Sequence, residues 1–200
     1  MTLGPAAGSK VPQAIRRRVL GDYGLGVFEI RSLSYDHPDA LTLTEQVQDY
    51  YREIYGGRDE DPLTAEELIP PHGGFVVGYL DGRPVTMGGW LFTGSPPGEA
   101  SGGGVQPRER VAQIRRMFVV PEARRHGLAT SVLTRLEHDA ARHGATRIIL
   151  ATGQPQQAAI AFYRRHGYAD IAPFGYYAGG GLLVCLGKNL GAHLAGQPTN

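Results

Sequence analysis

The chain has 200 residues, of which 42% are hydrophobic, and this content suits one globular domain with a sizeable core. Its formal net charge of +1 gives no overall reason to expect nucleic acid or an anionic membrane as a partner. The single cysteine excludes an intramolecular disulfide and a multi-cysteine zinc site, and no segment reaches the ~18 apolar residues of a membrane span, so we expect a cytoplasmic protein.

The first third of the chain predicts an arm, a strand and two helices. Residues 1–23 are rich in Gly, Ala and Pro, and we expect them to form a flexible N-terminal arm. An apolar run at 27–30 predicts the first strand. After Pro38, apolar residues recur every three or four positions until Gly56, which predicts a helix with a left-handed glycine stop. The Thr-Ala-Glu-Glu segment at 64–67 has the capping-box pattern and predicts a short second helix.

The rest of the chain alternates strands and helices. Asp81-Gly82 lies between two apolar runs, 75–80 and 85–92, which is the pattern of a β-hairpin. Residues 94–107 hold many glycines and prolines and predict a loop. The later elements expected are a strand at 111–120, a helix at 125–143, a strand at 147–152, a helix at 155–166, and strands at 168–171 and 182–188.

This order predicts a single α/β domain over residues 24–190, with 191–200 as a C-terminal tail. We expect a mixed central sheet of six to seven strands, flanked by about four helices. The strands at 111–120 and 147–152 should be parallel, because a helix connects them through a right-handed crossover.

Residues 117–129 join an apolar strand, a proline turn and a basic, glycine-bearing helix start. The backbone N–H groups of a first helical turn have no intrahelical acceptor and carry the positive end of the helix dipole. Gly127 would let an anion come close to them. The segment therefore predicts a phosphate-binding site.

Two sequence blocks resemble a known family. Arg124-Arg125-His126-Gly127-Leu128-Ala129 fits (Gln or Arg)-x-x-Gly-x-(Gly or Ala), and it follows a Val-x-Pro turn. Downstream, residues 158–168 fit A-x-x-x-(aromatic or Leu)-Tyr-x-x-x-Gly-(Phe or Tyr). In this order, the two blocks resemble the GNAT superfamily of acyl-CoA N-acyltransferases.

The resemblance implies a GNAT fold, with the sheet splayed between its fourth and fifth strands. It also implies acetyl-CoA as co-substrate, with the pyrophosphate on the N–H groups of the helix start and the pantetheine arm beside the fourth strand; no metal is implied. The binding residues that it implies are Met117, Phe118, Val119, Arg124, Arg125, His126, Gly127, Leu128, Ala129, Thr130 and Gln156.

By the same resemblance, the chain is expected to move an acetyl group to a primary amine of a small molecule or peptide by direct attack. Tyr163 would act as general acid. The glutamates that many relatives use as general base are replaced by Gln113 and Ala151, and an amide cannot accept a proton at neutral pH. The base is then water, the amine's own ionisation, or another side chain, for which His72, His37 and Glu29 are the candidates.

The acceptor stays open at this stage. Residues 36–67 hold ten acids against two arginines, which fits a cationic acceptor such as a polyamine and equally fits a solvated acidic helix face. Residues 35–37 and 176–177 are expected beside the acceptor, by analogy with relatives. An acyl-CoA-binding sensor without transferase activity is the alternative function. We do not expect the arginines at 16–18 to bind nucleic acid, because the chain lacks the interleaved aromatic residues that such binding uses. A homodimer is an open alternative to a monomer.

Overall fold

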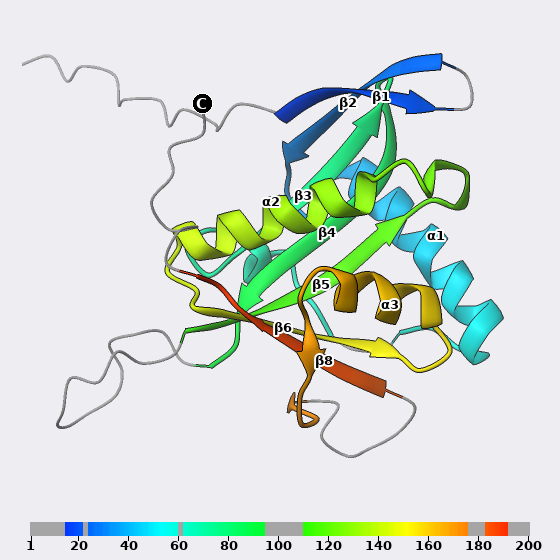
Figure 1. The fold of residues 1–200 in the computed structure, drawn as a ribbon. Helices are drawn as coiled ribbons and strands as arrows, with labels where there is room; N and C mark the ends of the chain where they lie inside the picture. The colour runs from blue at the N-terminus through cyan, green and yellow to red at the C-terminus, as the bar shows by residue number, and fades with distance from the viewer. Residues whose placement is uncertain (1–14, 22–23, 60–61, 95–109, 176–182, 192–200) are drawn as a thin grey trace, which may run out of the picture.

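The computed structural model describes residues 15–21, 24–59, 62–94, 110–175 and 183–191. These residues form one mixed α/β layer structure (Figure 1). The elements, in chain order, are β1 Ile15–Gly21, β2 Gly24–Ser32, α1 Pro38–Tyr55, the 3-10 turn η1 Glu66–Leu68, β3 Gly73–Leu80, β4 Arg83–Phe92, β5 Val111–Val119, the 3-10 turn η2 Pro121–Ala123, α2 Leu128–Arg142, β6 Arg147–Gly153, α3 Gln157–Arg165, β7 Ala169–Asp170 and β8 Leu183–Asn189.

The sheet has eight strands in the order β1-β2-β3-β4-β5-β6-β8-β7. The α/β prediction is confirmed, with one strand more than the upper expectation. The extra strand is β1, so the prediction of a flexible arm is wrong for residues 15–21, which pair antiparallel with β2 from Ile15↔Ile30 onward. Charged residues are common on edge strands, where they discourage pairing with another chain. The rest of the arm and tail, residues 1–14 and 192–200, lies outside the described residues.

The described residues contain three α-helices rather than about four, because the capping box at 64–67 begins only a 3-10 turn. Both of its hydrogen bonds form: Thr64 N donates to Glu67 Oε2 at 2.8 Å, and Glu67 N donates to Thr64 Oγ1 at 3.4 Å. Two prolines, Pro70 and Pro71, follow, and proline has no N–H with which to continue a helix. The capping box is therefore confirmed, but the element that follows it is a 3-10 turn and not an α-helix.

The predicted hairpin of β3 and β4 is confirmed. Asp81 and Gly82 both have left-handed backbone angles, with φ of 49° and 79°, as a tight two-residue turn between twisted strands requires. The Asp81 carboxylate also accepts a hydrogen bond from the Val27 backbone N–H at 2.8 Å. The turn is thereby joined to β2.

Helices cover both faces of the sheet. A Cβ added to Gly88 on β4 would lie 2.9 Å from Leu136 of α2, whereas the Met87 sulfur is 3.9 Å from the Thr44 hydroxyl of α1. Because successive strand residues point to opposite faces, α1 and α2 lie on opposite sides of β4. In Figure 1, α2 and α3 are on the viewer's side.

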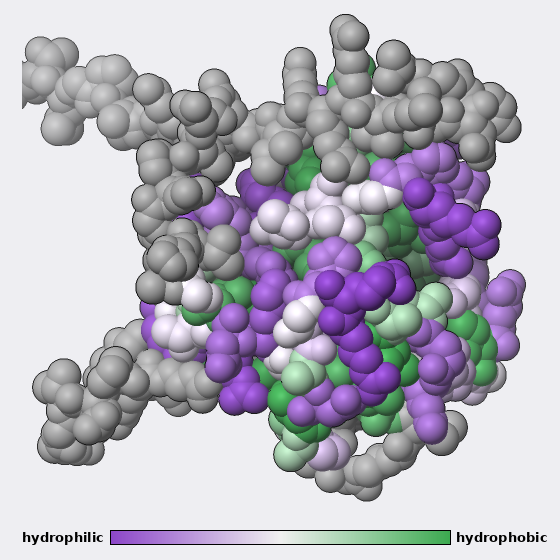
Figure 2. Space-filling model, viewed as in Figure 1, coloured by the Kyte–Doolittle hydropathy of each residue, from purple (hydrophilic) through white to green (hydrophobic). Residues whose placement is uncertain are grey.

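The surface of the face drawn in Figure 1 is mixed in character. Figure 2 shows hydrophobic residues between groups of hydrophilic ones, without a single continuous apolar area on the described part of that face. The homodimer stays a prediction. In the described part of the chain, no helix is long and apolar enough to cross a bilayer.

The sheet opens between β5 and β6. The two strands are parallel, as predicted, but they pair only from Val111↔Arg147 to Gln113↔Ile149. Beyond these pairs β5 continues to Val119 and β6 continues to Gly153 without pairing to each other. The expected splay is thus present, and it leaves backbone edges of both strands facing a gap.

A β-bulge lies on β5 beside this gap. Met87 pairs with Phe118 and Gly89 pairs with Arg115, so that Arg116 and Met117 together oppose Gly88. Arg116 has a φ of 53°, and a left-handed residue in one strand is how such a bulge places two residues against one. The bulge interrupts the strict alternation of side chains along β5.

A buried polar network links α2 to Tyr168 and to strand β8. The Glu137 carboxylate on α2 accepts a hydrogen bond from the Tyr168 hydroxyl at 2.9 Å and from the Lys188 ammonium of β8 at 2.9 and 3.0 Å. Burial and the neighbouring carboxylate raise the pKa of Tyr168, so this hydroxyl stays a donor. The network therefore orients the helix whose N-terminus faces the gap.

We expect Glu137→Ala to lower the free energy of unfolding by about 3 kcal/mol, because it leaves the Lys188 ammonium and the Tyr168 hydroxyl without their shared carboxylate. Tyr168→Phe should cost about 1 kcal/mol, since it removes one hydrogen bond and keeps the ion pair. Urea unfolding of the two variants measures both values. An equal loss in the two variants would show that the ion pair contributes nothing.

Candidate active site

A cavity of about 420 Å³, here named the helix-start cavity, lies between β5, the start of α2 and α3. Of the residues predicted to bind the cofactor, all but His126 line it, and Tyr163 lines it as well. The residues that the structure brings together there are Met117, Phe118, Val119, Arg124, Arg125, Gly127, Leu128, Ala129, Thr130 and Gln156. His126 is half-buried in the same loop, and its predicted role stays a prediction.

The loop before α2 is wound into a backbone cradle. Arg125 and Gly127 have φ of 68° and 72°, so α2 begins at Leu128 rather than at 125 as expected, because a left-handed residue cannot continue a right-handed helix. No side chain caps this N-terminus, and no acid lies in its first turn. The N–H groups of the first turn have no intrahelical acceptor, so they can bind an anion.

Side chains of the loop hold the cradle in place. Arg124 donates from Nε to the Val119 carbonyl oxygen at 3.0 Å, and its guanidinium lies 5.2 Å from the centre of the Tyr50 ring on α1. The Thr130 hydroxyl lies 3.2 Å from His166 Nε2, which connects α2 with the end of α3. The cradle is therefore braced by both neighbouring helices.

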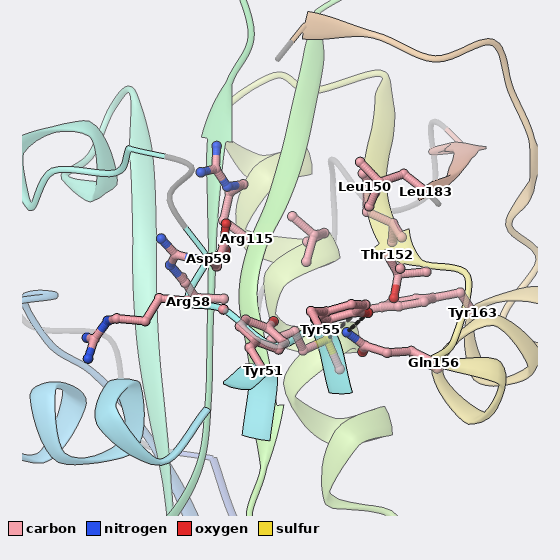
Figure 3. A pocket seen from close by; sticks show the side chains of 17 residues that line it. Tyr51, Tyr55, Arg58, Asp59, Arg115, Leu150, Thr152, Gln156, Tyr163 and Leu183 are labelled. Atoms are coloured by element: carbon pink, nitrogen blue, oxygen red, sulfur yellow. Dashed lines mark hydrogen bonds and ion pairs between the residues drawn. The ribbon is translucent and has the colours of Figure 1, made fainter. Parts of the chain in front are cut away.

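A second cavity, also of about 420 Å³, lies on the other side of Tyr163, in the gap between β5 and β6. Four residues line both cavities and form the wall between them: Met117, Gln156, Ala159 and Tyr163. The other residues that line the second cavity are Tyr51, Tyr55, Gly57, Arg58, Asp59, Ile114, Arg115, Arg116, Leu150, Ala151, Thr152, Gly153 and Leu183 (Figure 3).

The bulge and the splay explain why consecutive residues of β5 line this cavity. In a regular strand, neighbours point to opposite faces, yet residues 114–117 all line it. The bulge turns Arg116 and Met117, and the missing partner strand exposes the edge that they share. The second cavity is thus a consequence of the open sheet.

Tyr163 is buried in the shared wall, with 7% of its surface exposed. Its hydroxyl donates to the Met117 sulfur at 3.4 Å, and a thioether is a weak acceptor. Burial, with a smaller effect of Tyr51, raises the pKa of Tyr163 above its usual value. The hydroxyl therefore keeps its proton and can give it to a stronger acceptor.

The second cavity has an ion pair on its β5 side. Arg116 donates from Nη1 to the Asp59 carboxylate, and the two side chains are 7% and 29% exposed. Burial first, and then the Asp59 carboxylate, raise the pKa of Tyr51 to about 12. On the opposite side, the Gln156 amide donates to the Tyr55 hydroxyl at 2.8 Å, the dashed contact in Figure 3.

The structure does not bring the proposed general bases to either cavity. His37 is the N-cap of α1, where its Nδ1 accepts a hydrogen bond from Asp39 N at 3.2 Å. Glu29 pairs with Arg31 at 2.9 Å on β2, and His72 lies outside both linings. The two positions where relatives carry a glutamate base hold no acid here. Gln113 is buried outside both linings, and Ala151 lines the second cavity.

The described acids of the 36–67 segment, apart from Asp59, lie outside both linings, and two of them pair with nearby arginines. Glu45 accepts from Arg58, and Asp49 accepts from Arg52 on the same helix. Of the described acids in this segment, Asp59 alone lines the second cavity. This arrangement is the solvated acidic helix face that the sequence left open as an alternative. Residues 176–177 lie outside the described part, and Tyr35 is not in the lining.

Sequence reasoning missed most of the second cavity, including Tyr51, Tyr55, Asp59 and Arg116. A usable signal existed for the two tyrosines, because they are four positions apart on a predicted helix and therefore share a face. No local signal marks Arg116, since its place depends on a bulge opposite Gly88.

Comparison with known proteins identifies the family. The model of the acetyltransferase (GNAT) family matches residues 41–168, from within α1 to the residue before β7. The chain belongs to the GNAT acetyltransferase family. An IAA acetyltransferase of Azospirillum brasilense is 30% identical over 150 residues, which cover 75% of this chain and 90% of that protein.

Solved structures of GNAT proteins share the fold. A Klebsiella pneumoniae protein assigned as an acyl-CoA N-acyltransferase superposes with a TM-score of 0.61 at 22% identity, covering 82% of this chain and 97% of that one. The protein yncA of Salmonella typhimurium, solved with its cofactor acetyl-CoA, has a TM-score of 0.59 at 18% identity and covers 83% and 95%. This chain is therefore an acetyl-CoA-dependent acyltransferase.

The residues present fit acetyl-CoA. The uncapped, acid-free start of α2 suits its pyrophosphate, and the unpaired edge of β5 offers backbone N–H and C=O groups to the amides of its arm. In the described residues, no group of three or more His, Cys, Asp or Glu side chains is placed to hold a metal ion.

We expect Gly127→Val to weaken acetyl-CoA binding at least about tenfold, because a β-branched residue resists the left-handed angle on which the cradle depends. Gly82→Val is the matched control, since Gly82 has a similar φ of 79° and a Cβ there would meet nothing within 4 Å. Isothermal titration calorimetry should show the loss in the first variant alone. Equal affinities in the two variants would contradict the cradle.

Proposed function

We propose that the protein is an N-acetyltransferase that moves an acetyl group from acetyl-CoA to a primary amine of a small molecule or peptide by direct attack. The observation that carries this proposal is the shared wall of Tyr163, Met117, Gln156 and Ala159, along which two cavities of about 420 Å³ each adjoin. The helix-start cavity would hold the donor, and the second cavity the acceptor. A reaction between them would take place at the wall.

The donor side binds through backbone groups. The N–H groups at the start of α2 face the helix-start cavity with the positive end of the helix dipole. The Thr130 hydroxyl adds a side-chain donor at the same place. Bound acetyl-CoA supplies an activated acetyl thioester, and the chain's contribution is to fix that group against the wall.

The acceptor amine would attack the acetyl carbon from the second cavity. A carbon–nitrogen bond forms and the carbon–sulfur bond breaks, so that the products are an amide and free coenzyme thiol. One proton leaves the amine for water, and one proton passes to the departing sulfur. Tyr163 is the group in the wall that can supply the second proton, and it regains a proton from water before the next turnover.

Two properties of Tyr163 support this role. Its hydroxyl donates to the Met117 sulfur, a weak acceptor that it can exchange for a more basic sulfur at low cost. Burial raises the pKa of Tyr163, so the hydroxyl is protonated at neutral pH, as a general acid must be, while the same burial makes it a weaker acid than an exposed tyrosine. Both properties place a protonated donor where the sulfur would leave.

The amine would have to arrive without its proton. Of the described residues in the two linings, Asp59 is the one carboxylate, and it is already engaged by the Arg116 guanidinium. None of the described lining residues is a histidine. Deprotonation therefore depends on the amine's own ionisation in water.

We expect Tyr163→Phe to lower kcat by roughly a hundredfold, which is the lower end of what a positioned general acid contributes. The dissociation constant of acetyl-CoA should change less than about threefold, because backbone groups dominate its binding. Thiol release measures kcat, and calorimetry measures the dissociation constant.

Tyr79→Phe is the control, because it removes the hydroxyl of Tyr79 on β3, which donates to Asp39 at 2.6 Å and lies outside both cavities. Its turnover should stay near that of the unaltered protein. If Tyr163→Phe turns over as fast as Tyr79→Phe, Tyr163 is not the acid. If acetyl-CoA binds and no amine of a broad panel releases thiol, the sensor alternative replaces the transferase.

The pH dependence should follow the acceptor rather than the enzyme. We expect kcat/KM to rise with pH up to the pKa of the amine, and a change of amine to move the profile by the difference in amine pKa. Because the pKa of Tyr163 is raised, its proton should not be lost below about pH 10, the ordinary tyrosine value, and no falling limb is expected there. A rising limb at the same pH for every amine would reveal a base on the protein.

A further inference from the structure

The side chain of Tyr55 crosses the open end of the sheet. Tyr55 is the last residue of α1, a helix that packs against β4 and β5. Its hydroxyl accepts a hydrogen bond at 2.8 Å from the amide of Gln156, which directly precedes α3 (Figure 3). Because β5 and β6 stop pairing at Gln113↔Ile149, this contact joins the two sides of the sheet at the end where the strands are apart.

Gly153 leaves the space that the Tyr55 side chain occupies. Gly153 is the last residue of β6, and it lines the second cavity together with Tyr55. A Cβ added to Gly153 would overlap the Tyr55 hydroxyl, and the three heavy atoms nearest to that Cβ would all belong to Tyr55. Tyr55 therefore covers the second cavity on the side of the turn between β6 and α3.

This cover is less firmly held than the wall beside it. The Tyr55 side chain is 41% exposed, whereas Tyr163 in the wall is 7% exposed. Its ring lies 5.8 Å from the ring of Tyr51, centre to centre, and its hydroxyl is held by the Gln156 amide. A hydrogen bond between neutral groups contributes only ~1 kcal/mol, so Tyr55 can turn toward solvent at low cost.

We propose that Tyr55 is a specificity-determining residue that limits the size of the acceptor amine. With Tyr55 in place, the second cavity measures about 420 Å³, near the lower end of the ~300–1,000 Å³ of small-molecule sites. A small amine fits such a space, while a longer chain requires the Tyr55 ring to move. The acceptor class is then small-molecule amines rather than peptides. This inference rests on the proposed function.

The test measures how acceptor size affects the rate in variants that move or remove Tyr55. The acceptors are three series that each run from short to long: n-alkylamines, ω-phenylalkylamines and glycine peptides. Thiol release gives kcat/KM, which is corrected for the fraction of free amine at the working pH. The readout is the ratio of kcat/KM for the longest amine of a series to that for the shortest. A merely structural defect lowers both values and leaves this ratio unchanged.

We expect Gly153→Ala and Tyr55→Ala to raise the ratio at least about tenfold, since one methylene more or less in a pocket changes kcat/KM by ~10–200-fold. Gly153 lies in a strand, so alanine can adopt its backbone angles and acts through the displaced Tyr55 ring. Tyr55→Phe keeps the ring and loses the hydrogen bond to Gln156, so its ratio should lie between those of Tyr55→Ala and the unaltered protein.

Two matched controls should leave the ratio unchanged. Gly191→Ala adds a Cβ that would meet nothing within 4 Å, and Gly191 lines neither cavity. Tyr79→Phe removes a hydroxyl that is bonded to Asp39 outside both cavities. Thermal unfolding shows whether each variant is folded. Calorimetry should give acetyl-CoA dissociation constants within about threefold of each other, because backbone groups dominate donor binding.

An unchanged ratio in Gly153→Ala, or in Tyr55→Ala where that variant is folded, would refute the inference, while N-acetyl transfer would stand. An equal loss of rate for all amines gives the same unchanged ratio and would show that Tyr55 has a structural role. A glycine peptide that is the best acceptor of the unaltered protein would also refute it. Bound acetyl-CoA with no thiol release from any amine would refute the proposed function, and this inference with it.

Discussion

The parting of β5 from β6 is the feature on which the site depends. The strands share only the pairs from Val111↔Arg147 to Gln113↔Ile149, and both then continue alone. An unpaired strand edge inside a sheet leaves backbone groups that must find other partners. Here the open edges face two cavities, so their backbone groups are within reach of a bound ligand. The bulge at Arg116 adds to this, because it turns charged side chains toward the gap.

The two cavities offer a ligand different kinds of contact. On the helix-start side, the contacts come from backbone N–H groups and a left-handed loop, whose geometry depends on Gly127 and Arg125. On the other side, side chains decide, namely the Arg116–Asp59 pair, Arg115 and the aromatic rim of α1. Backbone recognition depends on the shape of the fold and can persist through sequence change. Side-chain contacts change with single substitutions, so the lining of the second cavity can vary more readily than the cradle.

Buried groups keep the two halves aligned. Glu137 links α2 to Tyr168 and Lys188, while Arg124 and Thr130 link the cradle to α1 and α3. These contacts fix the start of α2 relative to the wall that holds Tyr163. A general acid and its acceptor must be held within hydrogen-bond reach, and such supports provide that precision. The low polarity around Tyr163 then keeps its proton in place.

The sequence by itself determined the elements with local causes. The hairpin at Asp81-Gly82, the glycine stop at Gly56 and the strand-turn-helix around Gly127 follow from backbone preferences of a few residues, and the two motif blocks indicated the family. Only the tertiary structure decided which side chains share a cavity. In the structure, His37 and Glu29 lie away from the second cavity, whereas Asp59, Tyr55 and Arg116 line it. The sequence could not predict this arrangement, because a bulge opposite Gly88 and a contact between distant segments have no local signature. The tertiary structure also placed residues 15–21 in the sheet, since an edge strand is stabilised by its neighbour's backbone and not by its own hydrophobic pattern.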